Sequence, residues 1–361
     1  EPFEKEFKIR YRVDGALYEM APPPIHLANP VISRVKVMAG MNIAERRVPQ
    51  DGRIVMKVGE NRVDMRVNSL PTQYGESVVL RVLDRNNIVL DLNKLNLAPH
   101  IHEYILDTVA KPNGIFVVTG PTGSGKTTTL YAALREVNTI DSKLLTAEDP
   151  VEYDIDGIVQ VPINEQIGVT FPRVLRAFLR QDPDRILVGE IGDTDTAQIA
   201  IQAALTGHLV LSTLHTNDAP SSVARLADMG VDRFLIASAV RAIMAQRLCR
   251  RLCDCKVDGQ LTEKESRTLG IDITHGIKLP RPGGCERCRG KGMKGRMGIF
   301  EIFQVTDDVR GLINSNITSA QLRKRARELG MRTLREDGIR KVLAGLVSPD
   351  EVIRVTTGDA S

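Results

Sequence analysis

Residues 120–127 constrain the fold of this chain more than any other stretch of it. They read GPTGSGKT, which fits the pattern G-x-x-x-x-G-K-[ST], and they lie between the apolar run GIFVVT and the helix-like run TTTLYAALREV. A strand that turns through glycines into a helix directs backbone N–H groups and the positive end of the helix dipole at one point, where a phosphate binds. The pattern therefore predicts a phosphate-binding loop in a parallel α/β sheet.

The residue types in this loop suit a nucleotide with its metal ion. Glycines let the backbone turn inward, Lys126 can neutralise β- and γ-phosphate oxygens, and the Thr127 hydroxyl can bind Mg²⁺. A chance glycine-rich turn is the alternative, and the strand and helix on either side argue against it. We therefore predict binding of ATP and Mg²⁺. The predicted binding residues are Gly120, Thr122, Gly123, Ser124, Gly125, Lys126, Thr127 and Thr128.

Three further strand-like runs end in residues that can act on a phosphate. RILVGE ends at Glu190, whose carboxylate can polarise the attacking water or orient hydrated Mg²⁺. KLLTAED brings Glu148 to the same rim, where we assign it to water activation or metal contact. HLVLSTLH ends at His215, which can donate a hydrogen bond to the γ-phosphate. A structural role is the alternative for a histidine at a strand end, and we assign that role to His208.

The spacing of hydrophobic residues divides the chain into regions. In EFKIRYRVDG, apolar and polar residues alternate up to an Asp-Gly pair, which predicts a strand and hairpin at the start of a small mixed α/β domain. Farther along, apolar strands alternate with amphipathic helices, as in a parallel sheet with crossover helices. The predicted regions are the small domain at 1–90, a linker at 91–99, and a RecA-like domain at 100–361 that includes a Cys-, Gly- and Arg-rich part at 246–300 and a helical end at 301–361.

Length and composition are those of an ordinary globular protein. The 361 residues predict two or three domains of about 150 residues each, and 42% of the residues are hydrophobic. No run approaches the roughly 18 apolar residues of a membrane span, so we expect a soluble chain. The sequence begins at Glu1 and a strand-like segment follows at once, so we expect an N-terminal part to be missing.

Four segments together closely resemble the secretion-superfamily hexameric ATPases, which power type II secretion and type IV pilus assembly. The segments are GPTGSGKTTTLYAALREVN, TAEDPVEYDIDGIVQVPIN, FLRQDPDRILVGEI and AALTGHLVLSTLHTNDA. The resemblance covers nearly the whole chain. It implies that these are the Walker A, aspartate-box, Walker B and histidine-box elements, and the matching residues are Lys126, Glu148, Glu190 and His215.

The same resemblance implies a role for two arginines. RVNSLPTQYGESVVLRVLD looks like part of the family's N-terminal subdomain, whose arginines reach the nucleotide, and by position they are Arg66 and Arg81. Strand alternation places them on the face opposite Met65 and Val82, so a solvated face is the alternative. One departure is Gly192 in GEIGD, where the family usually has arginine.

The cysteines suggest a metal rather than disulfides, because five in a chain of this length are too few for a disulfide scaffold. Cys285 and Cys288 form C-x-x-C, whereas CRRLCDCK is irregular where the family has a second C-x-x-C. Zinc takes four thiolates at about 2.3 Å. We predict Cys253 and Cys255 as the other two, with Cys249 as a replacement from the preceding helix. Reduced thiols without metal are the alternative.

The resemblance leads to a function. Within the family a tetracysteine element marks assembly and secretion ATPases and is absent from retraction ATPases, which implies extension. We therefore expect a homo-hexameric ATPase for type IV pilus assembly, acting with an inner-membrane platform protein at the cytoplasmic face of that membrane, to which it attaches through partners. Type II secretion is the near alternative, and a non-catalytic nucleotide-binding scaffold is a further one.

The basic residues are concentrated in one part of the chain, which indicates the kind of partner it can bind. Residues 241–300 hold 14 Lys or Arg against 6 Asp or Glu, an excess that can meet acidic partner loops or lipid head groups. A RecA-like nucleic-acid translocase would need aromatic platforms for its strand. Aromatic residues are only 4% of the chain and tryptophan is absent, so we expect no nucleic-acid partner.

Overall fold

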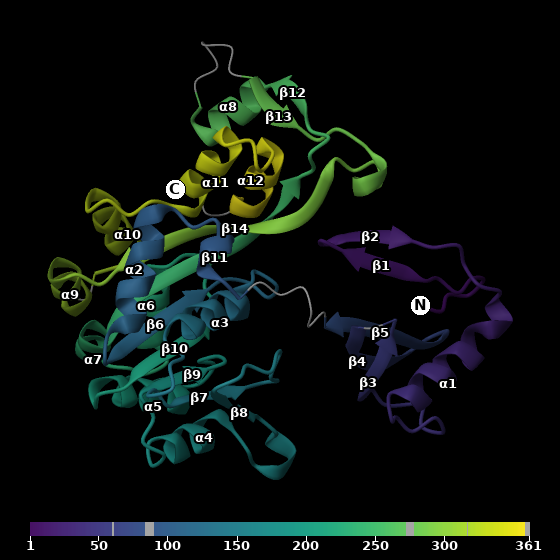
Figure 1. The fold of residues 1–361 in the computed structure, drawn as a ribbon, viewed down its shortest axis with the longest axis horizontal. Coiled ribbons are helices and arrows are strands. Elements are labelled where there is room, and N and C mark those ends of the chain that lie inside the picture. The colour runs from purple at the N-terminus through teal and green to yellow at the C-terminus, as the bar shows by residue number, and fades with distance from the viewer. Residues whose placement is uncertain (60, 84–89, 272–277, 316, 358–361) are drawn as a thin grey trace. The chain divides into compact units, whose positions relative to one another are not determined.

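A computed structural model describes residues 1–59, 61–83, 90–271, 278–315 and 317–357. The chain divides into two compact units, Glu1–Ile88 and Val89–Ser361 (Figure 1). Among the described helices, none has the length and apolar character that crossing a membrane requires.

The first unit is small and mixed, as its sequence pattern predicts. A hairpin of β1 (Arg10–Val13) and β2 (Ala16–Glu19) turns at Asp14 and Gly15, whose φ angles of 50° and 82° suit an Asp-Gly turn. The short helix η1 (Ile25–Leu27) leads into α1 (Ala28–Met38). A three-stranded antiparallel sheet follows, made of β3 (Gln50–Val58), β4 (Asn61–Thr72) and β5 (Gly75–Leu83).

The second unit is built on a seven-stranded sheet in the order β14-β11-β6-β10-β9-β7-β8. Every neighbouring pair is parallel except β11 and β14, which are antiparallel. The predicted parallel α/β architecture is confirmed. The strands are β6 (Gly114–Thr119), β7 (Leu144–Glu148), β8 (Ile158–Pro162), β9 (Arg185–Val188), β10 (Leu209–Leu214), β11 (Val240–Leu252) and β14 (Met293–Gln304).

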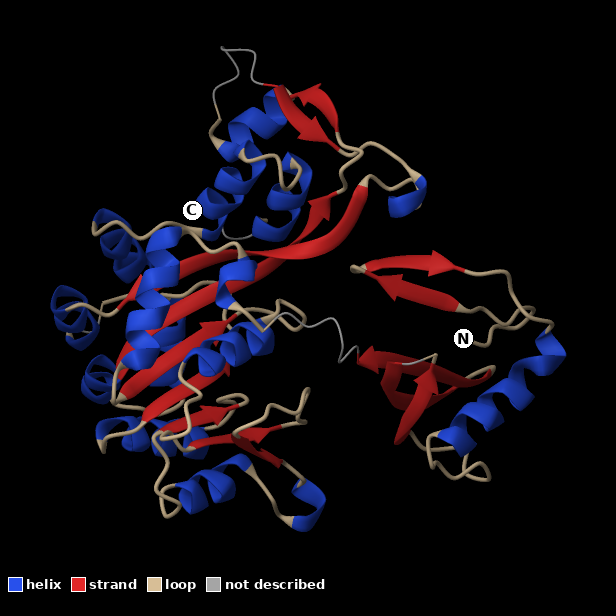
Figure 2. Ribbon diagram, in the orientation of Figure 1, coloured by secondary structure: helices blue, strands red, loops and turns tan. Residues whose placement is uncertain are grey.

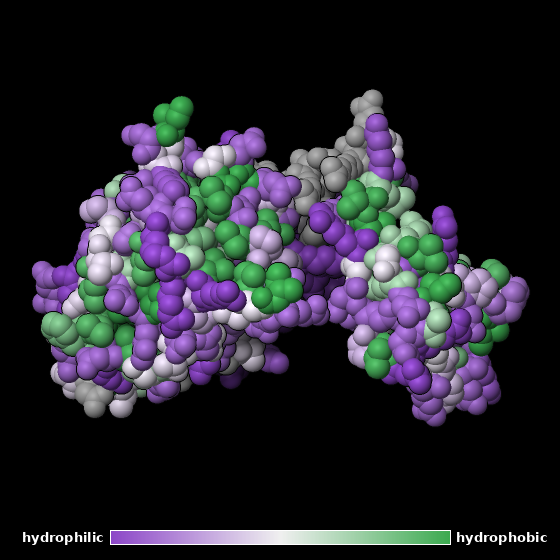
Figure 3. Space-filling view, turned by 90° about the horizontal axis from the view of Figure 1, so that it is seen from below, coloured by the Kyte–Doolittle hydropathy of each residue, from purple (hydrophilic) through white to green (hydrophobic). Residues whose placement is uncertain are grey.

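Helices cover both faces of this sheet (Figure 2). One face packs against α2 (Pro99–Ala110) and α3 (Lys126–Glu136). The opposite core takes α4 (Phe171–Phe178), α5 (Thr194–Leu205), α6 (Ser221–Asp228) and α7 (Arg233–Ala239). Outside these cores the surface in Figure 3 interleaves hydrophobic and hydrophilic residues, because polar residues are too few to cover a folded chain.

The cysteine-rich segment is an excursion between the two antiparallel strands of the main sheet. It contains β12 (Val257–Gln260), α8 (Glu263–Leu269), β13 (Lys278–Arg281) and the short helix η4 (Glu286–Cys288). Both ends of the predicted 246–300 region instead belong to β11 and β14. The helices α9 (Asp307–Asn314), α10 (Ser319–Glu328), α11 (Leu334–Leu343) and α12 (Pro349–Thr356) then end the chain.

The segment expected to be a linker is packed into the second unit. It forms the short helix η2 (Leu92–Leu95), and α2 begins at its last residue, Pro99. Leu92 is fully buried in the core beneath α2 and α3, and Ala98 is 5% exposed there. The apolar residues at 91–99 therefore anchor α2 to the core. The stretch 84–89, at the expected end of the small domain, lies outside the described residues.

Candidate functional site

The predicted phosphate-binding loop joins the buried strand β6 to helix α3, and two of its glycines are required by geometry. Gly120 has a φ of 148°, and a Cβ there would lie 2.5 Å from the backbone oxygen of Gln246. Gly125 has a φ of 88°, and its Cβ would lie 2.8 Å from the Gln246 Nε2. Both positions combine a backbone conformation that favours glycine with a close neighbour. Any larger residue would force the loop away from β11.

Lys126, the first residue of α3, is folded back on the loop. Its Nζ donates to the carbonyl oxygens of Gly120 at 2.8 Å and Pro121 at 3.2 Å. Burial lowers the pKa of Lys126, and the Glu190 carboxylate opposes that effect. Ser124 Oγ is buried and has no hydrogen-bond partner among the described residues. A buried hydroxyl without a partner is destabilising, so a phosphate oxygen at the loop would satisfy Ser124.

The remaining predicted loop residues line its exposed side and the first turn of α3. Thr122 and Gly123 are exposed at the tip of the loop, while Thr127 and Thr128 are half-buried in the helix. This placement leaves the Thr127 side chain at the helix N-terminus, where a hydroxyl suits Mg²⁺.

Glu190 and His215 lie together at the carboxyl edge of the sheet. Glu190 follows β9 and His215 follows β10, and the two strands are hydrogen-bonded neighbours. The His215 Nε2 lies 3.4 Å from Oε2 of Glu190, and each side chain is 51% exposed. Strand β10 also pairs with β6, so the phosphate-binding loop and both residues lie along three adjacent strand ends. In sheets of this kind, ligands bind at that edge.

Glu148 lies at the same edge but is held in a buried network. It is the last residue of β7 and only 3% exposed. Its carboxylate accepts hydrogen bonds from the Tyr131 hydroxyl of α3, from Thr146 Oγ1 at 2.5 Å and from Gln160 Nε2 at 3.1 Å. Burial and the Glu148 charge raise the pKa of Tyr131. Glu148 therefore ties β7 to α3, besides any part it takes in hydrolysis.

Sequence reasoning missed two polar residues that shape this site. Gln246 of β11 is 2% exposed. Its Nε2 donates to the Ser124 carbonyl at 2.8 Å, and its Oε1 accepts from Thr129 Oγ1 at 2.8 Å. Thr119, at the end of β6, accepts a hydrogen bond from the Thr216 backbone N–H at 2.8 Å. The sequence does carry a signal for Gln246, because Gln246 and Arg247 are two polar residues inside the apolar run AIMAQRL.

Three other predicted positions belong to other elements of the chain. His208 Nδ1 lies 3.0 Å from the carbonyl oxygen of Ala203, at the end of α5, which is a structural contact. Arg66 and Arg81 belong to the first unit, where they occupy directly opposed positions on β4 and β5. Arg66 is half-buried and Arg81 is exposed.

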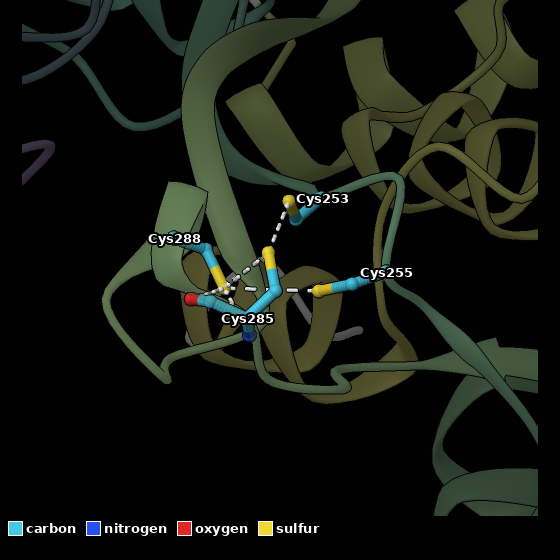
Figure 4. Close-up of side chains that lie close together, drawn as sticks. All are labelled: Cys253, Cys255, Cys285 and Cys288. Carbon is cyan, nitrogen blue, oxygen red and sulfur yellow. Dashed lines mark hydrogen bonds between the residues drawn. The ribbon is translucent and has the colours of Figure 1, made fainter.

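Four cysteines of the excursion converge on one point (Figure 4). The Sγ atoms of Cys253, Cys255, Cys285 and Cys288 all lie within 4.8 Å of one another. Three of these separations are 3.9 Å for Cys253 to Cys285, 3.7 Å for Cys255 to Cys288, and 3.7 Å for Cys285 to Cys288. Tetrahedral zinc with Zn–S bonds of about 2.3 Å requires sulfur atoms about 3.8 Å apart. The donor set and its spacing fit zinc.

The backbone around Cys288 favours the thiolate, which is the metal-binding form. The N–H groups of Cys285 and Gly292 donate to Cys288 Sγ at 3.3 and 3.1 Å. Burial raises the pKa of Cys288, but these hydrogen bonds, with those from the Cys255 and Cys285 thiols, lower it to about 6. These contacts therefore favour the charged form of the Cys288 thiol.

Cys249 does not belong to the cluster. The sequence suggested a helix here, but Cys249 lies on strand β11, where it is fully buried in the core. Burial raises the pKa of its thiol to about 12. Its side chain packs as a small apolar group, and the closely spaced Cys253 and Cys255 supply the first half of the cluster.

Comparison with known proteins places this geometry in a family. The family model described as type II/IV secretion system protein matches residues 1–354. Type II secretion system protein E of Aeromonas hydrophila is 49% identical over 360 residues, covering 99% of this chain and 72% of that protein. The type IV pilus assembly ATPase PilB of Myxococcus xanthus is 45% identical over 364 residues, covering 99% of this chain and 64% of that protein.

A solved structure shows the same fold. The X-ray structure of the Legionella pneumophila ATPase DotB matches with a TM-score of 0.71 and 21% sequence identity, covering 98% of this chain and 92% of that one. The sequence matches extend through both units, and the phosphate-binding loop lies at the carboxyl edge of the sheet. The chain belongs to the type II/IV secretion system protein family and is a P-loop ATPase.

Proposed function

We propose that this chain is the ATP-hydrolysing motor of a type II secretion system, with type IV pilus assembly as the second candidate. The observation that carries the motor assignment is the grouping of the phosphate-binding loop, Glu190 and His215 on three adjacent strand ends. Identities of 49% to a type II secretion protein and 45% to a pilus assembly ATPase support both systems, and we name the one with the higher identity first. The sequence had suggested the reverse order.

The residues of this edge would divide the hydrolysis of ATP among them. Backbone N–H groups of the loop bind the phosphates, and Lys126 exchanges its carbonyl partners for phosphate oxygens. Glu190 orients the attacking water, and His215 donates a hydrogen bond to the γ-phosphate. When bound, Mg²⁺ would neutralise charge on the β- and γ-phosphates. The Thr127 hydroxyl would hold the ion, and the Glu190 carboxylate would orient its bound water.

Arg66 and Arg81 would complete this site from a neighbouring chain in a hexameric ring. Two guanidinium groups on a separate domain approach the γ-phosphate only when the domains close, and each can stabilise the charge that spreads over the transferring group. Hydrolysis then releases that grip and lets one rigid body rotate against another. ATP hydrolysis would drive this rotation.

The cysteine cluster would hold one zinc ion as a structural element. Gly-rich turns and few apolar residues give the excursion little core of its own, so four metal–thiolate bonds would fix its shape. We assign contact with an inner-membrane platform protein to the basic excess of residues 241–300, and so place the motor at the cytoplasmic face of that membrane.

Deletion of the gene in its host, with complementation, tests the function. Loss of exoprotein secretion with normal surface pili, restored by the wild-type gene but not by Glu190→Gln, supports type II secretion. Loss of pili with normal secretion selects pilus assembly. Normal secretion and normal pili after deletion would overturn both candidates, while the purified chain's ATPase activity would still test the chemistry.

A further inference from the structure

Strand β11 presents two consecutive polar residues, Gln246 and Arg247, to opposite faces of the sheet at its nucleotide-binding edge. Alternation along the strand places Met244 in the core beneath α3 and Ala245 in the core on the other face. Gln246 accordingly contacts the phosphate-binding loop and α3. Arg247, which is 8% exposed, extends toward the loop that follows β10.

Arg247 lies between the two loops that make up the site. Its guanidinium donates to the carbonyl oxygen of Asn217 at 2.7 Å and to that of Gln246 at 3.2 Å. A Cβ on Gly120, the first residue of the phosphate-binding loop, would lie 3.3 Å from the Arg247 NH1. The Arg247 charge also contributes to the lowered pKa of Lys126. One side chain thus contacts the segment after His215 and lies against the start of the phosphate-binding loop.

We propose that Arg247 is a positioning residue of the ATPase site, which holds the loop after His215 beside the phosphate-binding loop so that the imidazole faces the bound nucleotide. This inference rests on the proposed role of His215 in hydrolysis. It adds a residue that acts on the reaction through the backbone of the loop at Asn217.

The far end of the same loop is fixed by other elements. The Ala219 backbone N–H donates to Glu301 of β14 at 2.9 Å, and Asp218 pairs with Arg323 of α10. The near end carries His215 at the exposed rim of the site, and the Thr216 backbone N–H after it donates to Thr119 Oγ1 of β6 at 2.8 Å. Among the described residues that follow His215 in this loop, Asn217 is the first to accept a hydrogen bond from a charged side chain, that of Arg247.

The chemistry of the contact requires an arginine. A guanidinium presents donors in a planar fork and can serve two carbonyl oxygens in different directions, whereas a lysine ammonium is a compact point charge on a flexible stem. Arg247→Lys should keep the charge and lose much of the positioning. A displacement of about 1 Å at a catalytic group can slow turnover by about 100-fold.

The test compares steady-state ATP turnover of the full chain in five forms with that of the wild type. The forms are Arg247→Ala, Arg247→Lys, His215→Ala, the double variant Arg247→Ala/His215→Ala, and Arg250→Ala. Arg250 lies on the same strand but pairs with Glu351 of α12. Its variant is therefore a matched control for loss of a β11 arginine. Melting temperatures and KM for ATP are measured alongside kcat.

We expect Arg247→Ala to lower kcat by about 10- to 100-fold with less than about a threefold change in KM. Arg247→Lys should fall between it and the wild type, and it serves as the test if the alanine variant does not fold. Arg250→Ala should lower the melting temperature and keep wild-type kcat. In the His215→Ala background, adding Arg247→Ala should produce no further loss of kcat.

Three results would overturn this proposal alone. Wild-type kcat in Arg247→Ala removes the residue from the mechanism, and equal losses in Arg247→Ala and Arg250→Ala assign the effect to general weakening of β11. Additive losses in the double variant show that Arg247 acts independently of His215. Wild-type turnover by His215→Ala alone would instead overturn the proposed role of His215 and this inference with it, leaving the ATPase assignment intact.

Discussion

The imidazole Nε2 of His215 lies 3.4 Å from the carboxylate Oε2 of Glu190, although the two residues are 25 positions apart in the sequence. Two neighbouring parallel strands, β9 and β10, place them there. The contact brings a hydrogen-bond donor and a candidate catalytic carboxylate to one point beside the phosphate-binding loop. Changes to Glu190 should therefore affect chemistry, while changes to Lys126 should affect binding.

We expect Glu190→Gln to retain ATP binding and to lower kcat by about 100-fold or more, the range for loss of a general base. Lys126→Ala should instead weaken nucleotide binding, because it removes the charge that faces the phosphates. Nucleotide titration and steady-state turnover with Mg²⁺ separate the two effects. Glu165→Gln, an exposed residue of η3 (Glu165–Ile167), is the matched control and should behave as wild type. Equal turnover in Glu190→Gln and wild type would exclude Glu190 from the mechanism.

Metal analysis of the purified chain should find about one zinc per chain, because four thiolates at tetrahedral spacing form one site. Cys255→Ser should lower the zinc content and the melting temperature. Cys249→Ser is the matched control, since its thiol is buried elsewhere on β11, and it should keep its zinc. Equal zinc contents in the two variants, or a metal-free chain with unchanged melting, would contradict the site.

Glu301 should make stability depend on pH. Burial raises its pKa from 4.5 to about 7, with the Asp218 charge adding to the rise, while the Ala219 N–H and Arg323 oppose it. The folded chain therefore holds this proton more tightly than the unfolded chain. The resulting stability is complete below pH 4.5 and is lost as the pH rises through about 7, a loss of about 3 kcal/mol.

The variant Glu301→Gln stays neutral and should not lose stability in this way. We therefore expect the free energy of unfolding of Glu301→Gln, relative to wild type, to improve by about 3 kcal/mol between pH 4.5 and pH 8. Urea denaturation across this pH range measures the difference, and Glu165→Gln provides the control. Parallel pH profiles for Glu301→Gln and wild type would show that Glu301 ionises normally in the folded chain.

Mixing variants tests whether the arginines act between chains. Arg66→Ala and Glu190→Gln chains should each be nearly inactive alone. If Arg66 serves the site of a neighbouring chain, mixed rings contain some sites with both residues intact, and turnover returns. Arg66→Ala mixed with Arg66→Ala/Glu190→Gln is the control and should stay inactive. No rescue in the first mixture would place the arginine within its own chain or outside the mechanism.

The sequence predicted where residues lie along this edge of the sheet when the signal is local, and it missed contacts whose partners are distant in the chain. The phosphate-binding loop, Glu190 and His215 follow from strand periodicity and from the rule that parallel strands end at one edge. The Tyr131 contact of Glu148 joins a helix to a strand and depends on side-chain packing that periodicity does not encode.

Strand β11 is the largest difference between expectation and structure. Its run VRAIMAQRLCRRL places polar residues inside an apolar stretch, so neither the helical nor the alternating pattern is clear. Its pairing with β14 joins residues more than 40 positions apart, and that register sets the positions of Gln246 and Cys249. A long-range contact of this kind cannot be read from local composition.

The same strand connects the phosphate-binding loop to the cysteine cluster. Gln246 contacts the phosphate-binding loop, and the next cysteine of the metal cluster along the chain is Cys253, seven residues farther on. At about 3.3 Å per residue, an extended strand spans roughly 23 Å over that distance. Hydrogen bonds to β14 run along most of this length, so β11 connects the phosphate-binding loop to the cysteine excursion through a continuously paired strand. A displacement of the excursion along the strand would therefore be transmitted to the phosphate-binding loop.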